Sequence, residues 1–139
     1  MSFELWVSAF ANEETAWLPA KAIRHRFAPL IAGEDDGTFP LRFPDGPSLA
    51  RLYLSENDAG RMDGFTIGRP PDFLVFWEVI AGILRDFPCV LYWPSEPARA
   101  CMGSLDLLPH LPADFLEVHG VPYVSTDASE VRNYVRDNQ

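Results

Sequence analysis

The side chains that could bind a metal ion are few in this chain and widely separated. Both cysteines and two of the three histidines fall in the pattern C-x11-C-x8-H-x8-H, formed by Cys89, Cys101, His110 and His119. Zinc sites usually include at least one pair of closely spaced ligands, so this spacing predicts no metal site. The run Glu56-x-Asp58-x-Gly60 lacks the glycine and the bidentate glutamate of an EF-hand loop, and we expect a solvated turn there.

Catalytic motifs give no support for an enzyme. The chain contains no G-x-S-x-G turn, no P-loop and no G-x-G-x-x-G loop. Adjacent carboxylates occur at Glu13-Glu14 and Asp35-Asp36. Catalytic carboxylates require desolvation to shift the pKa of one partner, whereas both pairs fall in polar turns. We therefore expect no catalytic residues and no cofactor.

Two further side chains could form a binding site. Arg69 falls between a predicted strand and a predicted helix. Its guanidinium could hold a carboxylate by two hydrogen bonds, or form an internal ion pair that braces the turn. Trp17 follows Glu13 and Glu14 and is the tryptophan that we most expect at the surface. It could anchor a partner, because tryptophan is enriched at binding hot spots, or it could pack against the first helix.

The charge balance narrows the class of partner. Twenty Asp and Glu residues oppose eleven Lys and Arg residues, giving a formal charge of −9. Binding to nucleic acid or to an anionic membrane surface is therefore not expected, whereas a basic protein would be attracted at long range. Acidity can also serve solubility alone. The candidate partner-binding residues are Glu13, Glu14, Trp17, Glu34, Asp35, Asp36, Glu56, Asp58 and Arg69.

The chain shows no targeting or membrane signal. Met1–Phe10 lacks a basic segment and a cleavage pattern, and no apolar run approaches the ~20 residues of a membrane-spanning helix. Cys89 falls in a predicted core strand, so we expect a buried thiol rather than half of a disulfide bond. These features predict a reduced, cytoplasmic protein.

The stretch from Gly68 to Pro94 is expected to form the centre of the fold. Pro70 and Pro71 are expected to open a helix, with Asp72 in its first turn, because the first-turn N–H groups need no intrahelical partner. The residues from Phe73 to Leu84 are almost all apolar, which predicts a helix buried on most of its circumference. Pro88 ends it, and Cys89–Trp93 predicts a buried strand.

The remaining elements follow from apolar periodicity and from the positions of proline and glycine. We expect strands at Ser2–Phe10, Phe39–Phe43, Ser48–Ser55, Gly64–Gly68 and Val121–Ser125. We expect helices at Leu18–Ala28, Leu111–Gly120 and Asp127–Arg136, and an irregular segment after Pro94. The order predicts a single α+β domain over residues 1–139, with a mixed β-sheet and helices packed on one or both of its faces.

Several short motifs carry a resemblance to a known family. They are Ser2-Phe3-Glu4-Leu5-Trp6-Val7, the turn Arg42-Phe43-Pro44-Asp45-Gly46, the run Asp63-Gly64-Phe65-Thr66-Ile67-x-Arg69-Pro70-Pro71, Trp77, and Val90-Leu91-Tyr92-Trp93-Pro94. Over most of its length the chain resembles a family of small uncharacterised bacterial cytosolic proteins. That family is similar in size, acidity and compartment to immunity proteins of secreted toxin systems, including type VI and contact-dependent ones.

The resemblance implies a non-enzymatic binding protein, an immunity protein that neutralises a cognate bacterial toxin by direct protein–protein binding. Such a protein would cover the active site of the toxin with an acidic surface. The alternative is a small-molecule-binding or enzymatic domain with a pocket near Arg69. An acidic face with an exposed tryptophan favours the first hypothesis, and a ligand pocket would favour the second.

Overall fold

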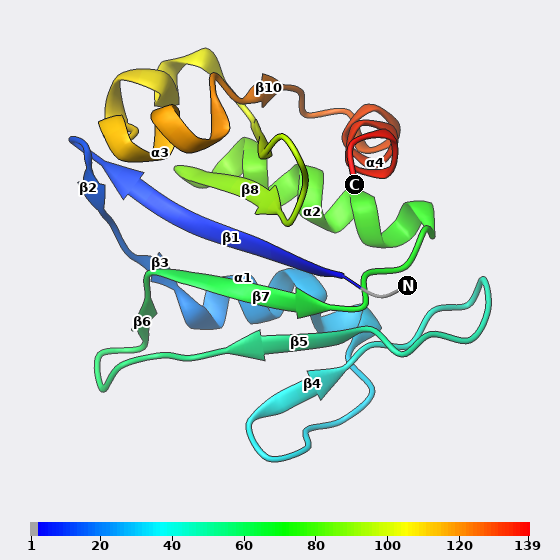
Figure 1. Ribbon diagram of the computed structural model, residues 1–139. Helices are drawn as coiled ribbons and strands as arrows, with labels where there is room; N and C mark the ends of the chain where they lie inside the picture. The colour runs from blue at the N-terminus through cyan, green and yellow to red at the C-terminus, as the bar shows by residue number, and fades with distance from the viewer. Residues whose placement is uncertain (1–2) are drawn as a thin grey trace.

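A mixed sheet forms the centre of the molecule, seen in a computed structural model that describes residues 3–139 (Figure 1). Neighbouring strands are antiparallel, except that β10 and β9 are parallel. The short β2 (Glu14–Thr15) extends the sheet by pairing with the end of β1. The strand order is β10 (Tyr123–Val124), β9 (Arg99–Met102), β8 (Cys89–Trp93), β1 (Glu4–Ala11), β7 (Gly64–Gly68), β5 (Arg51–Leu54) and β4 (Thr38–Pro40).

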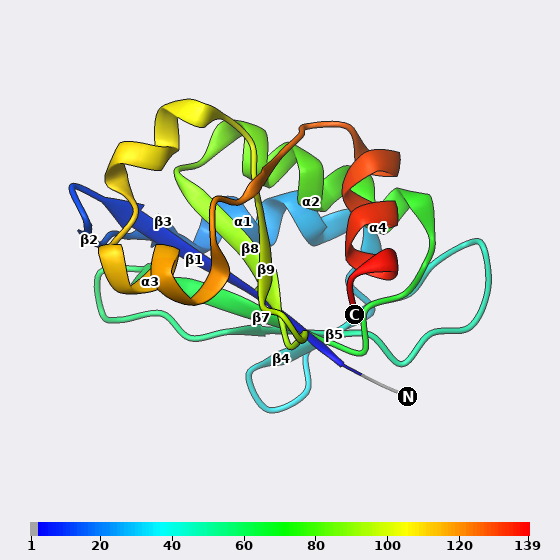
Figure 2. The same cartoon turned by 45° about the horizontal axis from the view of Figure 1, so that its top comes forward.

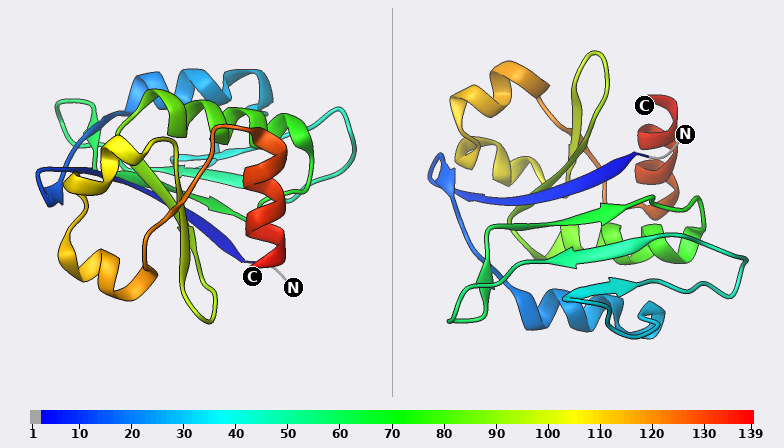
Figure 3. Two further views of the ribbon diagram at one scale, coloured as in Figure 1. Left: turned by 90° about the horizontal axis from the view of Figure 1, so that it is seen from above. Right: turned by 60° about the horizontal axis from the view of Figure 1, so that its bottom comes forward.

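Helices cover one face of this sheet completely and the other face in part. The helices α1 (Ala20–Phe27) and α2 (Leu74–Asp86) lie side by side on the first face, and α4 (Ala128–Asp137) packs against α2 (Figure 2). The second face carries α3 (Ala113–His119) and the 3-10 helix η2 (Leu105–His110), which lie over β8 and β9 (Figure 3, left). The predicted α+β class, a mixed sheet with helices packed on one or both of its faces, is confirmed, and the helices lie on both faces.

The main core lies between the sheet and the helices of its first face. Leu5, Val7 and Ala9 alternate along β1 toward this face and are buried, as is Trp77 on α2. A smaller core on the second face joins Val90 and other side chains of β8 and β9 to η2 and α3. Strand β8 is thus buried on both faces, which explains its uninterrupted apolar run.

The helices found within residues 3–139 leave the second face uncovered over the other half of the sheet (Figure 3). No helix lies in front of β1, β7 and β5 in the right view of Figure 3. The strand register aligns one row of outward side chains from β4 to β8, namely Thr38, Tyr53, Thr66, Trp6 and Tyr92. An antiparallel sheet tolerates one wet face when its outward residues are polar or amphipathic, as these are.

The predicted helix Leu18–Ala28 begins later than expected. Leu18 and Pro19 form β3, which pairs with β6 (Arg61–Met62) in a separate two-stranded sheet, and α1 starts at Ala20. The pairing of Leu18 with Met62 keeps the chain extended there, and local periodicity contains no sign of it. After α1, the 3-10 helix η1 (Ala28–Leu30) contains Pro29.

The start of the central helix also differs. Pro70, Pro71 and Asp72 precede α2, whose N-cap is the extended Phe73. Asp72 is therefore not in the first turn, and its carboxylate instead lies 4.0 Å from the guanidinium nitrogens of Arg132 and Arg136 on α4. Tertiary attraction between α4 and the segment before α2 thus replaces the expected interaction with the helix dipole.

The segment after Pro94 is not irregular. It contains β9 and η2, and Ser104 caps η2 by accepting a hydrogen bond from the Asp106 N–H. The short apolar run of β9 is stabilised by its pairing with β8, which a local pattern does not reveal.

The other expected elements are present with small shifts at their ends. The strand predicted for Gly64–Gly68 is β7, and the one predicted for Cys89–Trp93 is β8. The first strand begins at Glu4, and Ser2 lies outside the described residues. The helix predicted for Asp127–Arg136 is α4, and Asp127 caps it by accepting a hydrogen bond from the Glu130 N–H. None of the helices within residues 3–139 combines the length and apolar character needed to span a bilayer.

Candidate functional site

The predicted binding residues fall at three places rather than on one continuous patch. Glu13, Glu14 and Trp17 lie at the β1–β2 hairpin, and Arg69 follows β7. The other acids lie in the turns that precede β4 and follow β5, and they are Glu34, Asp35, Asp36, Glu56 and Asp58. All nine residues are exposed.

The β1–β2 hairpin is a tight, externally fixed turn. Asn12 and Glu13 have φ angles of 53° and 65°, as a two-residue hairpin with the right-handed twist of its strands requires. The Asn12 N–H donates to His110 Nδ1 and the Glu13 N–H donates to the His110 carbonyl, each over 3.0 Å. The Trp17 side chain, 54% exposed, follows directly after β2. We call Glu13, Glu14 and Trp17 the hairpin corner.

Two of the other acids meet in one cleft. Glu34 and Glu56 line a hollow of about 600 Å³ together with Lys21 and Arg24 of α1. The Arg24 guanidinium lies 4.7 Å from the ring centre of Phe39, which also lines the cleft. The cleft therefore holds two acidic and two basic side chains, so it is not the purely acidic surface that the sequence suggested.

Asp35 is bound within the chain. Its carboxylate lies 3.3 Å from Nη1 of Arg51, and the same Nη1 donates to the Thr38 hydroxyl over 2.8 Å. This contact links the acidic turn to the uncovered sheet face, because Arg51 projects from β5 on that face.

Arg69 lines a pocket on the uncovered sheet face. The pocket encloses about 550 Å³, and its lining comes from β1, β5, β7 and the residues next to them: Phe3, Glu4, Leu49, Arg51, Tyr53, Gly68 and Arg69. Within residues 3–139, no carboxylate lies within 4 Å of the Arg69 guanidinium. The alternative prediction, an internal ion pair that braces the turn, is therefore wrong. We call this hollow the Arg69 pocket.

Sequence reasoning missed Glu4, Arg51 and Tyr53. Their outward direction follows from alternation along β1 and β5, since Leu5 and Leu52 point into the core. That these outward faces are neighbours, and that no helix covers them, depends on strand order. Strand order was not accessible from the local pattern.

The strained backbone coincides with the predicted sites. The non-glycine residues of positive φ within residues 3–139 are Asn12, Glu13, Asp36 and Arg69, and the last three were predicted to bind a partner. Asparagine and aspartate tolerate this conformation, but for Glu13 and Arg69 it is uncommon and costs energy. Backbone strain is found most often at functional positions, which supports the hairpin corner and the Arg69 pocket.

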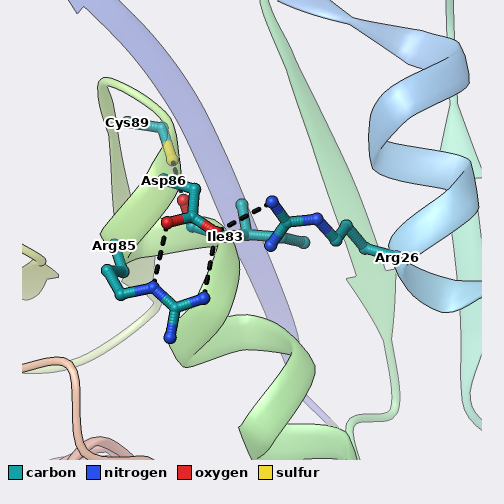
Figure 4. A network of polar contacts seen from close by, with 5 residues as sticks. All are labelled: Arg26, Ile83, Arg85, Asp86 and Cys89. Atoms are coloured by element: carbon teal, nitrogen blue, oxygen red, sulfur yellow. Dashed lines mark hydrogen bonds and ion pairs between the residues drawn. The ribbon is translucent and has the colours of Figure 1, made fainter.

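The side chains whose pKa values are shifted lie outside the hairpin corner and the Arg69 pocket. Hydrogen bonds from Arg85 and Arg26 hold the pKa of the Asp86 carboxyl well below its usual range, at the end of α2 (Figure 4). Burial raises the pKa of the Cys89 and Cys101 thiols to about 12. These groups stabilise the fold or lie within its core. The part of the chain that the structure describes contains no group of three or more potential ligands placed to hold a metal ion.

Comparisons with protein-family models, with curated proteins and with solved structures found no match to this chain. The resemblance to small bacterial proteins of the immunity type therefore stays a prediction.

Proposed function

We propose that this chain is a non-enzymatic protein-binding module, an immunity protein that neutralises a cognate toxin by binding it directly. The observation that carries the proposal is the exposed Trp17 beside the acidic Glu13 and Glu14 on a fixed hairpin. The partner surface is expected to be basic, since the chain carries a formal charge of −9.

The hairpin corner suits tight binding for a physical reason. A partner gains affinity by burying a large aromatic side chain, and it loses affinity when loops must be ordered on binding. The two hydrogen bonds to His110 already fix the turn, so little ordering remains to be done. The strained φ of Glu13 is consistent with a turn that is kept in one conformation for binding.

Charge and apolar contact are expected to act on different rates. Complementary charge accelerates association and loses this effect as salt screens it, whereas loss of a buried anchor mainly accelerates dissociation. The acids of the hairpin corner should therefore control the on-rate, and Trp17 should control the off-rate.

The test is co-expression with any toxin whose gene is found next to the gene for this chain, followed by stopped-flow binding at two ionic strengths. The chain should protect cells, and Trp17→Ala should raise the off-rate by at least about tenfold. Glu13→Gln combined with Glu14→Gln should slow association at low salt and have little effect at high salt. Leu49→Ala is the matched control, because Leu49 is 73% exposed but lies at the Arg69 pocket.

Failure to protect cells would exclude the immunity role. An on-rate that does not respond to salt would exclude electrostatic steering, and equal effects of Trp17→Ala and Leu49→Ala would exclude the hairpin corner as the anchor.

A second candidate function is small-molecule binding, which one observation favours. Arg69 lines a pocket of a size that suits a small ligand, and its guanidinium is exposed there.

A further inference from the structure

The Arg69 pocket is built around a row of residues that carry opposite charges. Arg51 on β5 pairs with Gly68 on β7, and Gly68 pairs with Glu4 on β1. Neighbouring strands lie about 4.8 Å apart, so the Arg51 and Glu4 backbones are separated by roughly 10 Å. The residue between them has no side chain. A basic and an acidic group therefore project from the same sheet face, with the glycine between them.

The Tyr53 ring covers this glycine and forms an aromatic wall of the pocket. A Cβ atom added to Gly68 would lie 3.1 Å from Tyr53 Cε2 and 3.6 Å from the Tyr53 hydroxyl oxygen, so the tyrosine leans over the glycine. The ring is 42% exposed, and the neighbouring Leu49 is 73% exposed. Together they give the pocket an apolar surface next to its charged groups.

The two arginines are placed to bind an anionic group. The side-chain hydrogen bonds that Arg51 makes within the described residues both use Nη1, and they fix its side chain to Thr38 and Asp35. Its Nε and Nη2 donors remain for a carboxylate, which a guanidinium can bind by two parallel hydrogen bonds. Arg69, which is exposed and has a backbone φ of 52°, adds a second guanidinium to the lining of the pocket.

We propose that the Arg69 pocket binds a small zwitterion with an apolar body, namely a free α-amino acid or the same groups on a short peptide. The carboxylate binds to Arg51 and Arg69, the ammonium group binds to Glu4, and the apolar body packs against Tyr53 and Leu49. The inference rests on the second candidate function, small-molecule binding, and is independent of toxin binding.

Glu4 is what distinguishes a zwitterion from a simple anion. Two arginines alone would also attract phosphate, which carries more negative charge than a carboxylate. The Glu4 carboxylate repels such an ion, whereas it attracts the ammonium group of an amino acid. The volume of about 550 Å³ lies within the usual range for small-molecule sites.

Calorimetric titration of the whole chain with matched probes tests the proposal. The probes are L-phenylalanine, N-acetyl-L-phenylalanine without the ammonium group, L-phenylalaninamide without the carboxylate, a phenylalanine-containing dipeptide, and inorganic phosphate. L-phenylalanine should bind at least about tenfold more tightly than its acetyl and amide derivatives, because each derivative leaves one charged side unpaired. The comparison of amino acid and dipeptide then identifies the natural form of the zwitterion.

Two variants assign the roles of the charged residues. Arg69→Gly should weaken L-phenylalanine binding by about tenfold without lowering the melting temperature, because glycine accepts the positive φ without strain. Asp36→Gly is the matched control, since Asp36 has φ of 54° and is not among the lining residues of the pocket. Glu4→Gln should weaken binding of L-phenylalanine and strengthen binding of the anionic N-acetyl-L-phenylalanine, because it removes both the attraction to the ammonium group and the repulsion of the carboxylate. A purely structural role of Glu4 would not produce these opposite effects.

The outcomes separate the inference from the function on which it rests. Preferential binding of phosphate or of N-acetyl-L-phenylalanine would overturn the zwitterion and retain small-molecule binding. If none of the probes binds at millimolar concentration, both the zwitterion proposal and small-molecule binding are rejected. Equal effects of Arg69→Gly and Asp36→Gly on L-phenylalanine binding would show that the ligand does not bind in the Arg69 pocket.

Discussion

The indole N–H of Trp77 donates a hydrogen bond of 3.0 Å to the carbonyl oxygen of Pro71. Trp77 is 3% exposed and lies on the apolar side of α2, and Pro71 belongs to the extended segment before that helix. One side chain therefore fills the core and also fixes the path by which the chain enters α2 from the Arg69 pocket.

Replacing Trp77 should destabilise the fold strongly. Trp77→Ala is expected to lower the free energy of unfolding by about 3–5 kcal/mol, as for a large aromatic side chain removed from a core. Trp77→Phe should keep most of the packing but leave the Pro71 carbonyl unpaired, at a cost of about 1–3 kcal/mol. Urea unfolding measures both. Trp17→Ala serves as the exposed control and should cost less than about 0.5 kcal/mol; similar losses for the two alanine variants would contradict the burial of Trp77.

The Asp86 cluster should make stability depend on pH in the acid range. Arg26 from α1 and Arg85 from α2 both donate to the Asp86 carboxylate, and they lower its pKa below the ordinary value of 3.8. Because the folded pKa is the lower one, the contribution of Asp86 is fully present above pH 3.8 and is lost as the pH falls toward the folded pKa.

Asp86→Asn should therefore reduce the loss of stability on acidification below about pH 4, and thermal melts across pH 2 to 6 would show it. Asp58→Asn is the control, because Asp58 is exposed and takes part in none of the ion pairs found within residues 3–139. If Asp86→Asn loses as much stability below about pH 4 as the unchanged protein, the Asp86 cluster does not contribute to the pH dependence of stability.

Both thiols should react slowly in the native protein. Cys89 and Cys101 have no exposed area, and burial raises the pKa of each to about 12. The thiolate is the reactive form, so little of it is present at neutral pH. Titration with a thiol reagent should show no rapid phase without denaturant and two equivalents in denaturant. A rapid equivalent for Cys101 would contradict its place in β9.

The strained hairpin predicts a separation of stability from binding. Glu13→Gly should not lower the free energy of unfolding, because the relief of the positive φ offsets the greater flexibility of the unfolded chain. Glu14→Gly, in the extended β2, should lower it by roughly 0.5–1 kcal/mol. Denaturant melts measure both changes. A larger loss for Glu13→Gly than for Glu14→Gly would show that the turn is not strained.

Elements with local signals could be predicted from the order of the residues. Strands β7 and β8, the burial of Cys89 and the exposure of Trp17 all agree with the prediction. For the strands and Cys89 the signal is the apolar pattern of the element itself, and for Trp17 it is the nearby acidic pair Glu13 and Glu14. Whether such an element forms depends mainly on residues close to it along the chain, and these can be read directly from the sequence.

The position of the Arg69 pocket depends on the pairing of strands that are distant in sequence. The row Arg51, Gly68 and Glu4 exists because β5, β7 and β1 pair in one register, and the pocket exists because α3 and η2 cover β8 and β9 but not these strands. The same holds for β3 and β9, whose partners stabilise short segments that are ambiguous alone. Strand order and helix placement minimise exposed apolar area over the whole chain, so no local pattern contains them.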